Sequence, residues 1–179
     1  DADFALFPIP GIAADGALFA PAVQERIIPD RAMLEGMRKP GHIILGWADK
    51  NLKSHCDALG ISIHEYEWDD DLMFLRGQAI VEGMLKIIIE NTDITIHRAK
   101  IVLVGQGTIG SLVTRTLYAL GARLHAVARN PVQRAMAYAA GAETHELTAL
   151  GEALPGADIV ISSVPAQIVT RAHLEKLPK

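Results

Sequence analysis

Three glycines, Gly105, Gly107 and Gly110, carry the clearest chemical signal in this chain because their spacing is Gly-x-Gly-x-x-Gly. The apolar run at residues 101–104 precedes them and a helical pattern follows at once, as where a buried parallel strand feeds a helix whose N-terminus holds a phosphate. The first glycine would permit the tight turn, the second would let a pyrophosphate approach the backbone, and the third would let helix and strand pack closely. We predict a dinucleotide-binding loop; a strand-to-helix turn without a ligand is the alternative.

The residues at the end of the next predicted strand, 123–128, indicate whether the site binds NAD or NADP. NAD sites usually place an acid there for the ribose hydroxyls, whereas an arginine accommodates the 2′-phosphate of NADP. This chain has Arg129 and Asn130 at that point. We therefore predict NADP, with NAD as the alternative; Arg129 could also be a solvated surface arginine.

A third segment, at residues 162–165, ends a later strand on the same edge of the sheet and could meet the nicotinamide ribose. A plain strand end followed by a helix-starting proline is equally compatible with it. The predicted cofactor-binding residues are Gly105, Gln106, Gly107, Thr108, Ile109, Gly110, Arg129, Asn130, Ser163, Val164 and Pro165.

Glu82 is the one candidate for acid–base catalysis. It lies between Val81 and Gly83 in a predicted helix, and a carboxylate in an apolar cleft could have a raised pKa and take up a proton. An exposed glutamate on a helix surface is the alternative.

We predict no metal site. The seven histidines form no set at helical spacing, and His42 and His55 fall on different elements. His97 fits a structural histidine better than a residue of an inter-lobe cleft. Cys56 is the single cysteine, which excludes an internal disulfide and a cysteine-based zinc site and fits a reducing, cytoplasmic setting.

Composition narrows the possible partners. A net charge of −4, a pI near 6.0 and 5% aromatic residues speak against binding to nucleic acid. The apolar runs are too short to span a bilayer, so we expect no membrane association. Hydrophobic residues make up 50% of the 179, enough for a real core.

The pattern of predicted strands and helices around the candidate site residues indicates an α/β protein with two lobes. Residues 1–75 predict a partial flavodoxin-like α/β lobe, residues 76–97 a helix and joint buried between the lobes, and residues 98–179 a Rossmann doubly wound parallel sheet without its C-terminal strands. The chain opens on an aspartate and stops one helix after a core strand, so we expect a piece of a longer protein. The predicted strands are 4–7, an edge segment near 26–28, 42–45, 61–66, 101–104, 123–128, 143–146 and 157–163; the predicted helices are 30–37, 49–59, 76–91, 108–120, 130–141 and 166–177.

With these pieces placed, the sequence resembles the A-subunit family of dipicolinate synthase, as a divergent or truncated member. The joint Thr92-Asp-Ile-Thr-Ile-His97 is more specific for this family than the glycine loop that follows it. The other matching runs are Val81-Glu-Gly83, Val102-Leu-Val-Gly-Gln-Gly-Thr-Ile-Gly110, Thr114-Arg-Thr-Leu-Tyr-Ala-Leu-Gly-Ala122, Val127-Ala-Arg129 and Val164-Pro-Ala166.

The resemblance implies an NADP-linked oxidation of a dihydrodipicolinate-type dicarboxylate to dipicolinate during sporulation. It also implies the B subunit of dipicolinate synthase as partner and a homo-oligomer. The chain departs from the family pattern at Ala79-Ile80 and at Thr108. Two alternatives therefore stay open: a catalytically weak nucleotide-binding or regulatory protein that works through a partner, and a dehydrogenase of the 2-hydroxyacid type.

Overall fold

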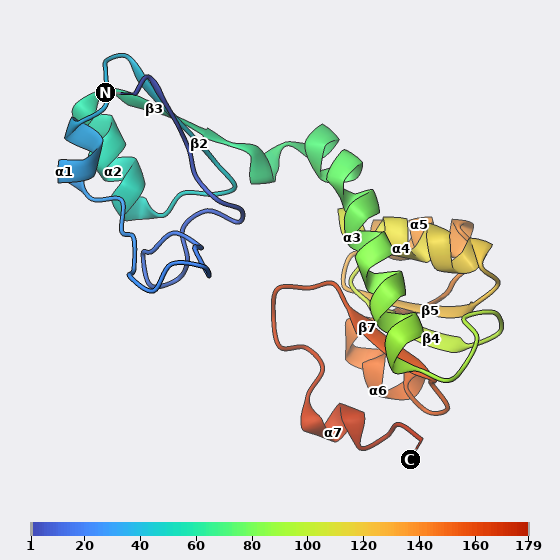
Figure 1. Cartoon of the computed structure of the whole chain (residues 1–179). Coiled ribbons are helices and arrows are strands. Elements are labelled where there is room, and N and C mark those ends of the chain that lie inside the picture. Colours follow the sequence, from blue (N-terminus) through green and yellow to red (C-terminus); the bar gives the residue numbers. More distant parts are fainter. Residues whose placement is uncertain (1, 179) are drawn as a thin grey trace. The chain divides into compact units, whose positions relative to one another are not determined.

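The structure, a computed structural model, describes residues 2–178 and divides into two compact units, Asp1–Met73 and Phe74–Lys179 (Figure 1). Both units are built on parallel sheets with helices as connections, so the predicted α/β class is confirmed. In the described part of the chain, no helix is both long and apolar enough to cross a membrane.

The N-terminal unit is a three-stranded parallel sheet in the order β1-β2-β3. Its two helices cover one face, where Leu34, Ile43, Leu52 and Cys56 form a common core. The segment at residues 26–28, predicted as an edge strand, is a loop, because it pairs with no strand of this sheet. The elements are β1 (Phe4–Leu6), α1 (Arg31–Glu35), β2 (Gly41–Leu45), α2 (Lys50–Leu59), β3 (Ile61–Glu65) and a short 3₁₀ turn at Tyr66–Trp68.

Local signals set the helix ends in this unit. The side chains of Asp30 and Asp49 accept hydrogen bonds from backbone N–H groups in the first turns of α1 and α2, at 2.9 and 2.8 Å. Gly60 ends α2 in the left-handed conformation, with φ of 66°.

The C-terminal unit is a four-stranded parallel sheet in the order β6-β5-β4-β7. This is the strand order of the first half of a doubly wound fold plus one strand beyond the switch point. Its elements are most of α3 (Asp70–Asn91), whose first turn falls within the N-terminal unit, β4 (Lys100–Val104), α4 (Thr108–Ala119), β5 (Arg123–Ala128), α5 (Pro131–Ala139), β6 (Glu143–Glu146), a 3₁₀ turn at Leu147–Ala149, α6 (Leu150–Ala153), β7 (Ile159–Ser162) and α7 (Arg171–Leu174).

Strand β4 lies at the centre of this unit and is buried on both faces. Ile101 and Leu103 pack in a core shared with α3, α4 and α5, while Val102 and Val104 pack with α6 on the other face. Figure 1 shows α4 and α5 on one side of the strands and α6 on the other. A near-continuous apolar strand is what this two-sided burial requires.

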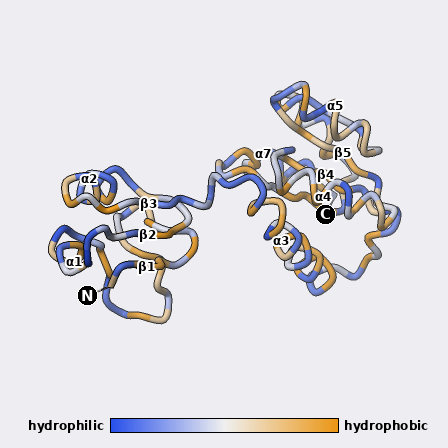
Figure 2. The backbone as a smooth tube through the Cα atoms, turned by 90° about the horizontal axis from the view of Figure 1, so that it is seen from above, coloured by the Kyte–Doolittle hydropathy of each residue, from blue (hydrophilic) through white to orange (hydrophobic). Residues whose placement is uncertain are grey.

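Helix α3 begins earlier than predicted because the side chain of Asp69 accepts a hydrogen bond from the Leu72 N–H at 3.1 Å and so caps its first turn. Val81 and Ile88 are buried, but Ile87 is 62% exposed. Figure 2 shows hydrophobic and hydrophilic residues mixed along its length. The predicted burial of this helix between two lobes stays a prediction.

The helix predicted over residues 166–177 is wrong in extent, because only Arg171–Leu174 is helical. The residues before it form bends, and Val164, Ile168 and Val169 pack their side chains against the core on the α6 face. Helical turns begin only at Thr170, which forms a capping box with His173.

Candidate dinucleotide site

A pocket of about 490 Å³ lies where β4, β5 and β7 end, at the carboxyl edge of the C-terminal sheet. This is the place where doubly wound folds bind ligands, and the volume is in the range of small-molecule sites. Eight of the predicted cofactor residues line it: Gly105, Gln106, Gly107, Arg129, Asn130, Ser163, Val164 and Pro165.

The three glycines differ in what surrounds them. Gly105 has φ of +99°, and a Cβ there would lie 2.6 Å from the Ser163 hydroxyl oxygen. A Cβ on Gly110 would overlap the carbonyl oxygen of Gly105. A Cβ on Gly107, by contrast, would meet nothing within 4 Å. Protein packing therefore explains the first and third glycines, while the second faces open space in the pocket wall.

Gly107 is also the N-cap of α4. Having no side chain, it cannot accept a hydrogen bond from the first turn, whose N–H groups have no partners within the helix. These groups and the positive end of the helix dipole are suited to an anion such as a phosphate. The other loop residues support this turn, since the Thr108 carbonyl accepts a hydrogen bond from Ser111, and Ile109 packs against the core.

Gln106 points back into the protein. Its side chain is 6% exposed and exchanges hydrogen bonds with the hydroxyl of Thr114 at 3.0 and 3.1 Å. The side chain thus connects the loop to α4. Gln106 still lines the pocket, although its amide group is engaged with Thr114.

Arg129 is exposed at the pocket, and among residues 2–178 no hydrogen bond or ion pair holds its guanidinium. Asn130 is engaged as the N-cap of α5, where its side chain accepts from the Val132 N–H at 2.8 Å. Arg134 is engaged as well, with its guanidinium donating to the carbonyls of Ala128 and Arg129 at 2.9 and 2.7 Å. Arg129 is therefore the arginine at this pocket that could receive a ligand.

Arg134 also pairs with Glu146 at 2.9 Å. Glu146 lies at the end of β6, opposite Ala128 at the end of β5. The acid at the neighbouring strand end is thus already neutralised by a structural arginine. This network was not predicted, because it depends on two strand ends meeting.

Ser163 fastens β7 to the glycine loop. Its hydroxyl donates to the carbonyls of Val104 and Gly105, at 3.2 and 3.3 Å. A hydrogen bond from this hydroxyl to a nicotinamide ribose stays a prediction, and it would require the hydroxyl to exchange partners.

The part of the chain that carries this pocket matches a known family. The family model for shikimate / quinate 5-dehydrogenase matches residues 87–179, just over half of the chain. The chain belongs to this family. The matched region contains the glycine loop and every other residue that lines the pocket.

The chain is also similar to the A subunit of dipicolinate synthase from Bacillus subtilis, with 24% identity over 177 residues, 98% of this chain and 59% of that protein. The crystal structure of the A subunit from Bacillus halodurans is 26% identical, has a TM-score of 0.84, and is matched over 98% of this chain and 60% of that one. The predicted resemblance is thereby confirmed. The chain spans about three fifths of the length of these relatives.

Two further matches are more partial. The glutamyl-tRNA reductase of Idiomarina loihiensis is 39% identical over 88 residues, which is 47% of this chain and 21% of that protein. The transhydrogenase structure from Sinorhizobium meliloti has a TM-score of 0.62 at 20% identity, over 84% of this chain and 53% of that one. The likeness to the transhydrogenase shows a shared fold.

In this member of the family, Glu82 lies on the exposed surface of α3 and does not line the pocket. Its catalytic role stays a prediction. Six residues that line the pocket were not predicted as cofactor residues: Val127, Ala128, Gln133, Leu147, Ala166 and Ile168. Gln133 could have been predicted from the sequence, because it lies one turn after the N-cap Asn130, at the end of α5 that faces the strand ends.

Two histidine pairs that were not predicted lie across neighbouring strands. His42 contacts His64, and His125 contacts His145, each pair with ring nitrogens 3.1 Å apart. Both pairs join neighbouring parallel strands, so helical spacing could not indicate them.

Proposed function

We propose that this chain is the cofactor-binding part of an NADP-dependent oxidoreductase. The observation that carries the proposal is Gly107: a Cβ at this position would meet no protein atom, yet the position is glycine, at the uncapped start of α4 in the pocket wall. The close approach of a pyrophosphate accounts for that choice. When bound, the nicotinamide would supply the hydride chemistry.

Arg129 supports NADP rather than NAD. It stands at the end of β5, where the adenosine ribose is held in doubly wound folds, and its guanidinium is uncommitted among the described residues. Planar guanidinium groups bind phosphate oxygens in pairs. Glu146, the acid at the adjacent strand end, is paired with Arg134, which lowers its ability to repel a 2′-phosphate.

For the reaction, the similarity to the A subunit of dipicolinate synthase supports oxidation of a dihydrodipicolinate-type ring to dipicolinate. The ring carbon would lose a hydride to the nicotinamide and a base would remove a proton, with aromatisation driving the step. Glu82 is our candidate for that base. We place this activity in the cytoplasm of sporulating cells, in a homo-oligomer that works with the B subunit of dipicolinate synthase. Residues 1–75 would form a partial N-terminal α/β lobe, residues 76–97 an inter-lobe helix and joint, and residues 98–179 the cofactor-binding domain.

A catalytically weak nucleotide-binding protein with a regulatory role is the second candidate function. The position of Glu82 on an exposed helix surface, outside the lining of the pocket, favours it. A protein extended to the length of its relatives and supplied with its partner would decide. Formation of NADPH from a dihydrodipicolinate precursor supports the enzyme, and nucleotide binding without turnover supports the regulatory role.

The nucleotide preference is tested with Arg129→Gln. We expect this substitution to weaken NADP binding roughly tenfold or more, which corresponds to the loss of one charge-assisted contact of about 1.5–3 kcal/mol, and to leave NAD binding nearly unchanged. Arg38→Gln, an exposed arginine in the other unit, is the matched control. Equal loss for both nucleotides would refute the role of Arg129.

A further inference from the structure

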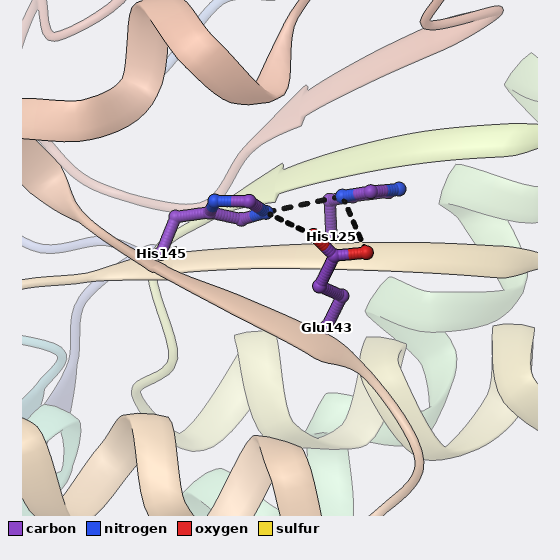
Figure 3. Close-up of side chains that lie close together, drawn as sticks. All are labelled: His125, Glu143 and His145. Carbon is purple, nitrogen blue, oxygen red and sulfur yellow. Dashed lines mark hydrogen bonds and ion pairs between the residues drawn. The ribbon is translucent and has the colours of Figure 1, made fainter.

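Three side chains meet on the edge strand β6 and its neighbour β5 in the C-terminal sheet, and none of the three lines the pocket (Figure 3). His125 comes from β5, and Glu143 and His145 come from β6. The register places His125 opposite Glu143, and His145 follows two residues later on the same face. The sheet itself therefore sets this arrangement.

The distances between the candidate ligand atoms fit a small metal ion. His125 Nδ1 lies 3.1 Å from His145 Nε2 and 3.6 Å from Glu143 Oε2, and His145 Nε2 lies 3.5 Å from Glu143 Oε1. Tetrahedral zinc with bonds of roughly 2.0–2.1 Å sets its ligand atoms about 3.3–3.4 Å apart. The distance between the two ring nitrogens is close to that value, and the two carboxylate distances, which end on different oxygens of Glu143, are slightly above it. With one oxygen of Glu143 taken as the ligand, the three ligand atoms lie within 4.8 Å of one another.

We propose that His125, Glu143 and His145 form a site for a divalent ion of the zinc class, with water in the fourth position. Two imidazoles and one carboxylate are the ligand set of catalytic zinc sites that keep an open position. Nitrogen ligands select against Mg²⁺ and Ca²⁺, which prefer oxygen.

Burial favours the neutral form of His125, the form in which an imidazole binds metal. The imidazole side chains of His125 and His145 are 15% and 16% exposed, whereas Glu143 is 65% exposed and leaves a route to solvent. Burial lowers the pKa of His125, and although Glu143 raises it, the charges of Lys100, His145 and Arg123 lower it further. The side chains of Lys100 and Arg123 each donate to a backbone carbonyl, while the Glu143 carboxylate lies against the two imidazoles.

A second histidine pair in the same chain provides an internal comparison. His42 Nδ1 and His64 Nε2 also lie 3.1 Å apart across parallel strands, with the same diagonal register. Among residues 2–178, no acid or cysteine joins that pair to make a group of three. A contact between two imidazoles is therefore not by itself evidence of a metal site in this chain. The site on β5 and β6 differs from the other pair because Glu143 adds a third ligand group.

An ion at this site would fasten β6 to β5. Strand β6 has four residues and forms the edge of its sheet. Leu147, which lines the pocket, follows β6 directly. Metal binding would thus slow opening of the edge strand and hold this wall of the pocket in place.

The test uses the full 179-residue chain without an affinity tag. Titration with Co²⁺ should give the intense visible absorption of a tetrahedral ion, and Zn²⁺ should remove it by competition. Glu143→Gln and His145→Gln should each weaken Zn²⁺ binding at least about tenfold, the lower end of the loss seen when even outer-shell partners of a metal are removed. His64→Gln, in the pair without an acid, should change nothing.

Hydrogen exchange of the metal-free and zinc-bound chain gives a second measurement. We expect slower exchange at the β6 amides on adding Zn²⁺, absent in Glu143→Gln although that variant shows the far-UV circular dichroism of the unsubstituted chain. The proposal is overturned if no Co²⁺ absorption appears, or if His64→Gln reduces Zn²⁺ binding as much as His145→Gln does.

Discussion

Replacing Gly107 by alanine separates the two roles that a glycine can have in this loop. Its backbone has φ of −75° and ψ of −162°, which alanine adopts readily, and the added Cβ would meet nothing within 4 Å. Alanine is a clearly poorer N-cap than glycine, but it also reduces the entropy of the unfolded chain, and the two effects oppose each other. We expect the free energy of unfolding to change by less than about 1 kcal/mol.

The same methyl group should interfere with a dinucleotide. It would project into the space where the pyrophosphate approaches the first turn of α4 and would cost at least one hydrogen bond to a charged group. Such a bond contributes about 1.5–3 kcal/mol, so NADP affinity should fall roughly 10- to 100-fold.

Gly110→Ala is the matched control, because its Cβ would overlap the carbonyl oxygen of Gly105. It should lower the free energy of unfolding by about 1–3 kcal/mol, the range for overpacked sites. Isothermal titration calorimetry and urea unfolding measure the two effects. The reasoning is refuted if Gly107→Ala binds NADP normally, or if it destabilises the chain as much as Gly110→Ala does.

Three further predictions concern other parts of the molecule. Burial raises the pKa of Glu65, but its hydrogen bonds and the charge of Lys53 hold the pKa below its usual value. Glu65→Gln should therefore cost about 1–2 kcal/mol in urea unfolding at pH 7. The difference should begin to shrink as pH falls below the unfolded-chain pKa of about 4.3, and it should disappear once pH is below the lowered pKa of the folded chain. Arg134→Gln should weaken NADP binding measured by calorimetry, because it frees the carboxylate of Glu146 beside the pocket; unchanged affinity would contradict this. Burial raises the pKa of the Cys56 thiol to about 11, so a thiol reagent at a pH of about 8 should label it only after unfolding, and rapid labelling of the folded chain would contradict the structure.

Features that depend only on residues close together in the sequence could be predicted from it. The apolar run before Gly105, the caps at Asp30, Asp49 and Asn130, and the left-handed Gly60 are all local signals. These signals locate the strands and helices and therefore the edge of the sheet where the pocket lies.

Features that depend on strand register could not be predicted in this way. Glu143 and His145 are 18 and 20 residues from His125, and only the parallel pairing of β5 with β6 brings them together. The contact of Arg134 with Glu146 has the same origin. A one-residue change in register would move alternate side chains to the other face, and the local pattern of Glu143–Glu146 does not fix that choice.

The preference between the two nucleotides tests the central claim most directly. Titration of the unsubstituted chain with NADP and with NAD, under identical salt and pH, gives both dissociation constants. We predict that NADP binds at least about tenfold more tightly, as one charge-assisted contact from Arg129 to the 2′-phosphate implies. Equal affinity for the two nucleotides, or binding of neither, would contradict the account.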